Sequence, residues 1–264
     1  MKKISTKEYK ELLIGILAYF NKLCRENNIK YSLIAGSLIG AVREGGIIPW
    51  DDDIDVILMP EEYKKLLAVI RKEKNTRYKA LIPLETKDYF MPYIKIVDTH
   101  TYLIDDDTIQ IKDNGIFIDV FKYGYVKKEK AKRLYKKTKI YRWLLAGVVD
   151  SKKKNNNFKN IMKNIRRLLF SKLFTYQRII KKYDSLFQNK KAEYVIINFP
   201  PFGPPKDLQK TADTNEYIDY KFEGINAMIF KNYDNILNNT FGDYMTPPPK
   251  DKRISHHHIT AYWK

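Results

Sequence analysis

Apolar residues recur at helical spacing at the start of the chain and then gather in short runs. Residues 6–28 place Leu12, Ile16 and Leu23 on one side of an expected amphipathic helix. The short runs predict strands at 31–35, 54–59, 78–82, 93–97, 101–104, 115–121 and 192–198. Further helices are expected at 38–43, 60–74 and 233–239. This order predicts an α/β (α+β) fold with a mixed sheet core and flanking helices.

Residues 127–191 have a different pattern, in which apolar positions at helical spacing face Lys and Arg, with a Lys- and Asn-rich stretch at 150–157. This part carries 22 Lys or Arg and 3 Asp or Glu, so that the rest of the chain is close to neutral. We therefore expect a basic helical insertion (127–191) between a catalytic core (1–126) and a C-terminal part (192–264) that completes the same domain. Packing on that domain is the favoured interpretation, and contact with an anionic membrane surface stays open beside it.

Composition excludes several classes of protein. A hydrophobic content of 44% with 14% aromatic residues is typical of a globular chain and not of a disordered one. Cys24 is the only cysteine, so no intramolecular disulfide can form. The N-terminal apolar run has no small-residue cleavage site, and no run reaches the ~20 apolar residues that cross a bilayer. We expect a soluble cytoplasmic protein, with peripheral binding at the inner face of the membrane as an open alternative.

Two acids open one of the predicted strands. Asp53 and Asp55 project to the same face of a strand, while Ile54 between them points into the core. Because two like charges held side by side repel, a divalent cation with oxygen ligands is the usual partner. A solvated acidic strand start is the plainer alternative. Asp119, inside the apolar run 115–121, is the candidate third carboxylate, unless neighbouring backbone amides bind it.

A glycine-serine pair follows the first predicted strand. Gly36 permits a sharp turn, and Ser37 stands where a helix N-cap would stand, so that amides and a hydroxyl converge at a positive helix end. This arrangement predicts a seat for a phosphate group, although many such pairs are only turns. Three adjacent histidines, His256–His258, cannot all face one ion on regular structure, so a metal cluster there is the less favoured interpretation and their role stays open.

The order of these features resembles the nucleotidyltransferase fold and, more narrowly, the LicD family of phosphocholine transferases, which is related to the fukutin-type ribitol-phosphate transferases. The motifs that carry the resemblance are GSLIGAVR at 36–43, IPWDDDID at 48–55, FIDVF at 117–121, FEG at 222–224 and GDYMTPP at 242–248. The WDDDID run is the most specific of them. The resemblance extends from about residue 31 to 258 with a gap over the basic segment.

The resemblance implies transfer of phosphocholine from CDP-choline to a sugar hydroxyl of a cell-surface glycan (teichoic acid, lipopolysaccharide or capsule), with release of CMP. Asp53, Asp55 and Asp119 would bind Mg²⁺, or Mn²⁺ in its place, and Asp119 would also accept the proton of the attacking hydroxyl. The other candidate donor-binding residues are Gly36, Ser37, Arg43, Trp50, Asp51 and Lys95. Gly36 and Ser37 would seat phosphate oxygens, and Asp51 would orient a metal-bound water or a neighbouring group.

The remaining implied roles concern charge and the choline group. Arg43 and Lys95 would offset developing negative charge. Trp50 and Tyr93 would supply an aromatic wall for a trimethylammonium group, although Trp50 also suits a bracing role in its loop. The acceptor would be a glycan, and a lipid-linked form of it would suit a basic surface helix.

Alternative functions follow from the same residues. A relative of the family could move ribitol phosphate or glycerol phosphate from a CDP donor, and a nucleotidyltransferase would use a nucleoside triphosphate. A module without catalytic activity could bind nucleic acid through its basic helices. We expect no specific nucleic-acid partner, because the sequence lacks a recognisable RNA-binding motif with interleaved aromatic residues.

Overall fold

Strand β6 (Phe117–Val126) is the centre of the main sheet, because strands pair with it along both edges. The computed structural model describes residues 2–105, 114–149, 173–187, 190–253 and 259–264. The sheet has the order β1 (Ser32–Leu33), β2 (Asp55–Leu58), β6, β4 (Ile94–Asp98), β3 (Tyr78–Leu81). Among the strand pairs of the described residues, only β2–β6 is parallel. The far half of β6 pairs with β7 (Tyr194–Ile197), which pairs with β8 (Leu208–Lys210).

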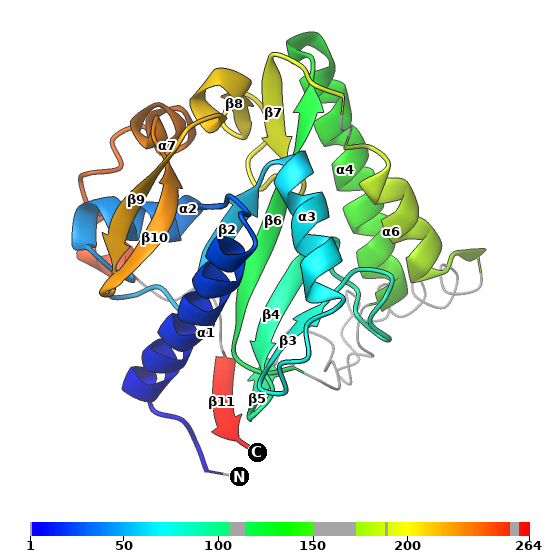
Figure 1. The fold of residues 1–264 in the computed structure, drawn as a ribbon. Coiled ribbons are helices and arrows are strands. Elements are labelled where there is room, and N and C mark those ends of the chain that lie inside the picture. The colour runs from blue at the N-terminus through cyan, green and yellow to red at the C-terminus, as the bar shows by residue number, and fades with distance from the viewer. Residues whose placement is uncertain (1, 106–113, 150–172, 188–189, 254–258) are drawn as a thin grey trace.

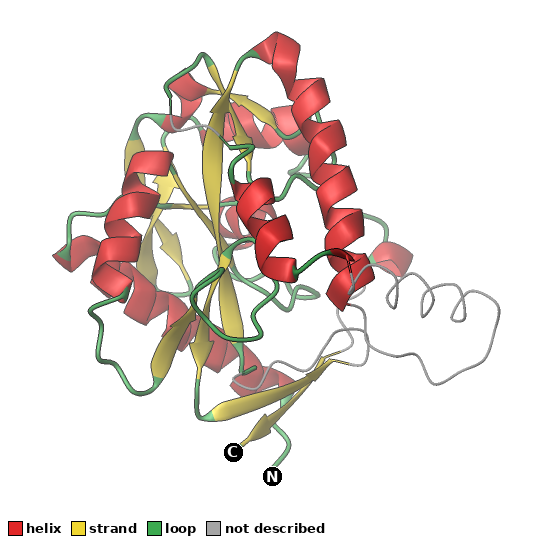
Figure 2. Cartoon of the chain, turned by 90° about the vertical axis from the view of Figure 1, so that its right-hand side faces the viewer, coloured by secondary structure: helices red, strands yellow, loops and turns green. Residues whose placement is uncertain are grey.

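Helices flank these strands, as the sequence predicts (Figures 1 and 2). They are α1 (Thr6–Glu26), α2 (Ala35–Ile39), a π-helical turn (Gly40–Glu44), α3 (Pro60–Ile70), α4 (Lys128–Val149), α6 (Tyr176–Asp184) and α7 (Tyr233–Phe241). Short 3₁₀ turns lie at Thr211–Thr214 and Lys250–Lys252. Helix α1 begins with a capping box, in which Ser5 and Glu8 satisfy each other's backbone N–H groups. Its buried side, which includes Leu13, Ile16 and Phe20, packs in the main core.

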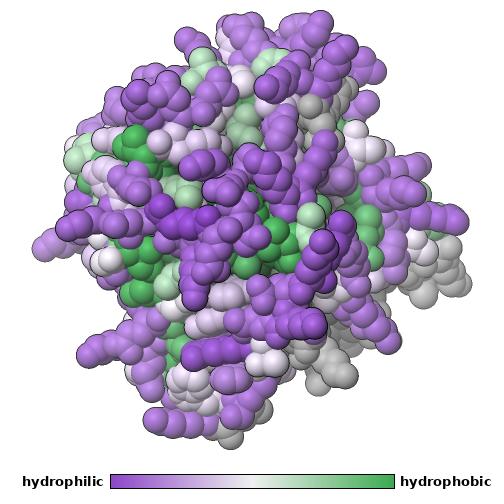
Figure 3. All heavy atoms as spheres, viewed as in Figure 1, coloured by the Kyte–Doolittle hydropathy of each residue, from purple (hydrophilic) through white to green (hydrophobic). Residues whose placement is uncertain are grey.

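Two further antiparallel pairs of strands complete the described structure. Strands β9 (Tyr217–Phe222) and β10 (Ile225–Phe230) pair with each other, and β11 (Ile259–Trp263) returns to β5 (Thr101–Asp105). The two ends of the chain therefore lie side by side (Figure 1), where Lys3 forms a bridge with Tyr262. Hydrophilic residues cover most of the face seen in Figure 3, with apolar patches between them.

The basic segment packs on the sheet where the structure describes it. Val126, Ala131, Tyr183, Phe187 and Ile196 form a small core between α4, α6 and the end of β6. The Tyr183 hydroxyl donates to the Asn198 carbonyl at 2.7 Å. The stretch 150–157, the part of the expected helical pattern at 158–172, and His256–His258 lie outside the described residues. None of the described helices is both long and apolar enough to cross a membrane.

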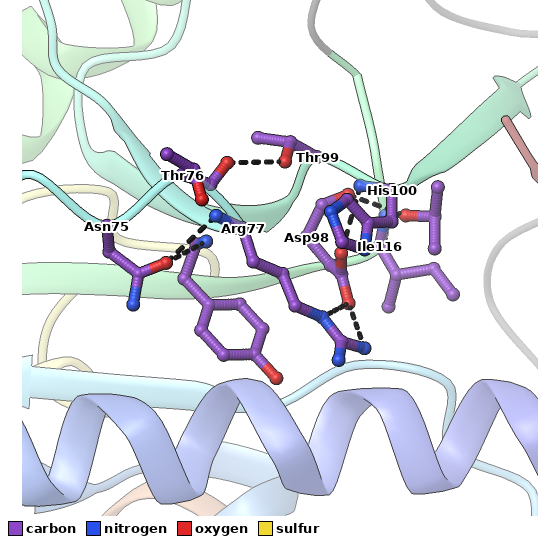
Figure 4. Close-up of polar contacts among 9 residues, drawn as sticks. Asn75, Thr76, Arg77, Asp98, Thr99, His100 and Ile116 are labelled. Carbon is purple, nitrogen blue, oxygen red and sulfur yellow. Dashed lines mark hydrogen bonds and ion pairs between the residues drawn. The ribbon is translucent and has the colours of Figure 1, made fainter.

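A buried carboxylate holds the turn at the end of β4 (Figure 4). Asp98 is fully buried and accepts hydrogen bonds from Arg77 Nε (3.0 Å) and Nη2 (2.9 Å) and from the His100 amide (3.0 Å). The Thr99 hydroxyl donates to the Thr76 carbonyl, which joins the same turn to the start of β3. This cluster joins the ends of β3 and β4, three residues along the strand from Lys95. We assign it a role in the stability of the fold.

Replacing Asp98 by Ala removes an acceptor that three donors share. We expect a loss of about 2–4 kcal/mol in the free energy of unfolding, because three hydrogen bonds to a buried, charged acceptor are lost. In thermal unfolding the midpoint falls by about 5–10 °C. Asp251→Ala, at an exposed site, serves as control and leaves the midpoint within about 1 °C. An unchanged midpoint for Asp98→Ala contradicts the assigned role.

Candidate active site

Three carboxylates meet where β2 and β6 run side by side. Asp55 is the first residue of β2, and Asp119 is its partner across the parallel ladder. Neighbouring strands lie about 4.8 Å apart, so the two side chains are adjacent on one face of the sheet. Asp53 precedes β2 in the loop, and all three acids line one cavity of about 360 Å³. The structure therefore brings together the three acids that the sequence singled out.

Lys95 approaches this cluster from the neighbouring strand β4, where it is the register partner of Asp119. Its Nζ lies 2.7 Å from Asp119 Oδ1, and both side chains are nearly buried. The ammonium also lies 3.0 Å from the centroid of the Phe117 ring. Lys95 is not among the described residues that line the cavity. Lys95 therefore forms an ion pair with Asp119 without lining the cavity itself.

Burial and mutual repulsion act on the remaining acids. Burial, followed by the charges of Asp53 and Asp119, raises the pKa of Asp55 well above its ordinary value. Burial, the charge of Asp53 and a hydrogen bond with Asp53 raise the pKa of Asp51 to about 7. One lysine is thus insufficient to offset the crowded carboxylates, and a further cation would relieve the repulsion.

The donor set fits a hard divalent cation. Asp51, Asp52 and Asp53 each offer a carboxylate oxygen, and these oxygens lie within 4.8 Å of one another. Oxygen-only ligands of this charge suit Mg²⁺ or Mn²⁺. Asp53 belongs both to this group and to the cavity trio, so that it is the acid best placed to bind the ion. The predicted ligand set Asp53, Asp55 and Asp119 stays a prediction, with Asp51 in reach of Asp53 as an additional ligand.

The turn at Gly36 and Ser37 lies next to the acids and is hydrogen-bonded to the backbone of one of them. The chain turns at Ala35, which has a φ of +53° and lines the cavity, one residue before Gly36. The expected N-cap role of Ser37 is wrong, because α2 begins at Ala35 and places Ser37 inside the helix. Instead, the buried Ser37 hydroxyl accepts a hydrogen bond from the Asp55 amide at 2.8 Å. Phosphate binding by Gly36 and Ser37 stays a prediction, and neither is among the described residues that line the cavity.

Gly36 has a spatial reason to lack a side chain, because a Cβ there would collide with Asp51 Oδ2. We expect Gly36→Ala to displace the Asp51 carboxylate and to lower the rate of donor cleavage at least tenfold, an effect of about 1.4 kcal/mol on the barrier. Gly15→Ala, inside α1, is the matched control and is expected to keep full activity. The measurement is kcat/KM for the donor, and equal values for the two variants would exclude this role of Gly36.

Arg43, in the π-helical turn, and Trp50, in the loop after it, brace the acidic loop. The Arg43 guanidinium donates to the Tyr244 carbonyl (2.9 Å) and to Glu44 (2.8 Å), and it lies over the Trp50 ring. Arg253 lies 5.1 Å from the centroid of the same ring. The GDYMTPP segment is thereby fastened to the acidic loop. Neither Arg43 nor Trp50 is among the described residues that line the cavity, and a direct donor contact stays a prediction for both.

The FEG motif fastens the same loop at another point. Glu223 Oε1 accepts a hydrogen bond from the Ile47 amide at 2.9 Å, and the Glu223 amide donates to the Gly45 carbonyl at 3.0 Å. A Cβ on Gly46 would collide with the Glu223 carboxylate. Gly46 therefore serves close packing, whereas Gly45 has open space around it and a φ of +73°. The motif positions the loop that carries Asp51 to Asp53.

Aromatic residues line the same cavity as the acids and form an aromatic wall, of which sequence reasoning found only one member, Tyr93. The aromatic residues that line the cavity are Tyr93, Phe121, Tyr123, Phe199, Phe202 and Phe241. Tyr93 contacts both Phe121 and Phe199, with ring centroids 4.6 and 5.4 Å apart. Strand alternation could have found Phe121 and Tyr123, which share the face of Asp119. Phe199 and Phe202 lie in a proline-rich loop without a periodic signal.

Comparison with known proteins bears directly on this site. A family model described as LicD/FKTN/FKRP, nucleotidyltransferase domain, matches residues 28–144, a range that contains all the site residues predicted from the sequence. Over 99% of both chains, the sequence is 31% identical to the lipopolysaccharide cholinephosphotransferase LicD of Haemophilus influenzae. Uncharacterized proteins of Rickettsia typhi and Rickettsia prowazekii are 36% and 41% identical over 30% and 22% of this chain.

Proposed function

The chain belongs to the LicD/FKTN/FKRP family and is a phosphotransferase, and we propose that it moves phosphocholine from CDP-choline to a sugar hydroxyl of lipopolysaccharide with release of CMP. The proposal of choline and of this acceptor starts from the Haemophilus relative, which matches the chain from end to end. We further propose that the reaction depends on Mg²⁺ and takes place in the cytoplasm.

The observation that carries the choline proposal is the composition of the cavity. Asp53, Asp55 and Asp119 line it together with six aromatic rings and several aliphatic residues. The other polar lining residues, Asp207, Gln209 and Thr240, are hydrogen-bonded within the protein. A trimethylammonium group binds favourably to aromatic faces, since it is cationic and has no hydrogen to donate from nitrogen. Ribitol and glycerol carry several hydroxyl groups, which such a wall does not satisfy. The cavity therefore favours choline over a polyol.

In the proposed reaction the acceptor hydroxyl attacks the phosphorus that carries choline. A new P–O bond forms while the bond from this phosphorus to the bridging oxygen breaks, and CMP leaves with that oxygen. Asp119 accepts the proton of the attacking hydroxyl, and Lys95 holds the Asp119 carboxylate in position at 2.7 Å. Asp53 and Asp55 would hold Mg²⁺, which when bound neutralises charge on the diphosphate.

A panel of donors tests the proposal. Purified protein is incubated with Mg²⁺, lipopolysaccharide and CDP-choline, CDP-ribitol, CDP-glycerol or ATP, and CMP release and phosphocholine incorporation are measured. We expect both products with CDP-choline alone. Preferred release of CMP from CDP-ribitol or CDP-glycerol would assign a polyol-phosphate transferase, and pyrophosphate release from ATP would assign a nucleotidyltransferase; either result overturns the proposal.

A variant of the aromatic wall sharpens this test. Phe202 is half exposed and contacts Phe241 at a centroid distance of 5.9 Å, so that its replacement leaves the core intact. Phe202→Leu is expected to raise KM for CDP-choline about fivefold to thirtyfold, in line with a lost cation–π contact of ~1–2 kcal/mol. Phe174→Leu, the same change outside the cavity, is the matched control and leaves KM unchanged.

A further inference from the structure

A second and larger cavity lies outside the acidic site, between the end of β6, the first turns of α4 and residues 185–186 and 190–192. Its volume is about 610 Å³, and Lys127, Lys130, Arg133, Lys137, Lys190 and Lys191 line it. The remaining lining residues include Val126, Leu134, Leu186 and Ala192. No Asp or Glu is among the described lining residues, and none of them lines the acidic cavity.

No ion pair among the described residues neutralises the positive charge of this cavity. Among the described residues, none of the ion pairs includes any of the six cations. All six side chains belong to exposed residues, so water screens them from one another in the free protein. Six cations that converge on an apolar floor create a strong local potential, which favours an anionic ligand.

The adjoining face of α4 carries exposed apolar side chains. Ile140 and Trp143 are 57% and 52% exposed. Lys136, four residues before Ile140, lies on the same face of the helix, and Lys139 lies beside them. Exposed Trp and Ile among lysines are typical of a helix that lies in the interface of a membrane, where lysine stems and indole rings reach the headgroup region. A soluble phosphate compound would make no use of these apolar side chains.

We propose that the basic cavity and this face of α4 dock the protein on an anionic lipid bilayer, with lipid phosphates in the cavity and Trp143 at the interface. The opposite side of α4 connects the docking surface to the active site. Arg142 donates to the Pro200 carbonyl at 3.0 Å and lies 4.0 Å from the centroid of Phe199, which lines the acidic cavity. Docking through α4 therefore sets the catalytic cavity near the membrane surface.

Vesicle sedimentation tests the proposal without any catalytic readout, so that lipid binding and donor cleavage can fail separately. The full chain is mixed with phosphatidylcholine vesicles, with or without phosphatidylglycerol, at low and high salt. We expect binding to the anionic vesicles alone, and its loss at high salt. The variant Lys130→Glu/Arg133→Glu/Lys137→Glu is expected to bind at least about 100-fold more weakly. Trp143→Ser is expected to weaken binding as well.

The control Lys22→Glu/Lys30→Glu/Lys221→Glu changes the net charge by the same amount at exposed sites on α1, the loop after it and β9. It is expected to weaken vesicle binding less than about tenfold, and circular dichroism checks that both triple variants are folded. Equal losses in the two variants, or no binding to anionic vesicles at low salt, overturn the proposal. So does displacement from the vesicles by millimolar inorganic phosphate, or binding of a DNA duplex with higher affinity than the vesicles.

Discussion

Asp53→Asn lowers phosphocholine transfer by at least about 1,000-fold and leaves the protein folded. Asp53 lies in both acidic groups, the cavity trio with Asp55 and Asp119 and the close group with Asp51 and Asp52. An amide in its place supplies a weaker ligand and removes a charge that would neutralise the bound cation, and preorganised charge of this kind contributes several kcal/mol to catalysis. The measurement is the initial rate of CMP release from CDP-choline.

The stability of this variant separates catalysis from folding. The charge of Asp53 raises the pKa of both Asp51 and Asp55, so its removal relieves repulsion in the metal-free protein. We expect the melting temperature of Asp53→Asn to equal or exceed that of the unchanged protein above pH 7. Asp213→Asn, at a site outside the cavity, is the control for the substitution itself. A variant that keeps more than about a tenth of the activity would refute the role of Asp53.

Lys95→Met lowers the free energy of unfolding by about 3 kcal/mol in the absence of a divalent cation. The Lys95 ammonium and the Asp119 carboxylate form a nearly buried pair at 2.7 Å. Removing one partner of a buried pair leaves a charge without compensation, here among other acids. The melting temperature is expected to fall by about 6–12 °C. Because a bound cation supplies the lost positive charge, Mg²⁺ should stabilise this variant more than the unchanged protein.

A double-variant cycle tests whether the effect comes from the pair. Lys95→Met/Asp119→Asn is expected to recover most of the stability that Lys95→Met loses, because no charge is then left alone. Activity should stay low in both variants, since Asp119 is the proposed proton acceptor. If Asp119→Asn gives no recovery, the destabilisation arises from packing against Phe117 and not from the ion pair.

The long elements of the fold could be predicted because their patterns are local. Helix α1 and strand β6 each carry enough periodic apolar residues to identify them, and Pro60 marks the start of α3. Strands β8, β9, β10 and β11 were missed. Exposed polar residues interrupt β8 and β9, and β11 exists only by pairing with β5, more than 150 residues earlier in the chain.

Of the candidate site, the acids could be predicted from the sequence and most of the aromatic wall could not. The acids could be found because Asp53 and Asp55 share strand parity and Asp119 lies within an apolar strand. The aromatic wall could not, because Phe199 and Phe202 reach the cavity through a loop whose position depends on distant contacts such as Tyr135 against Gly203. Ser37 was expected to cap the helix that follows it, but its hydroxyl binds the Asp55 amide. The helix begins earlier than expected because Ala35 has a positive φ, for which the sequence gives no signal.

Calorimetric titration of Mg²⁺ into the metal-free protein at about pH 6 and pH 8 tests the central claim, that the acidic cluster holds a divalent cation. A carboxyl group whose pKa is raised to about 7, like that of Asp51, destabilises the metal-free fold as the pH rises through 7, and a cation competes with its proton. The account predicts tighter binding at pH 8 than at pH 6, proton release on binding, and at least about tenfold weaker binding by Asp53→Asn. Binding that is absent from the unchanged protein, or equal in the variant and independent of pH, would contradict it.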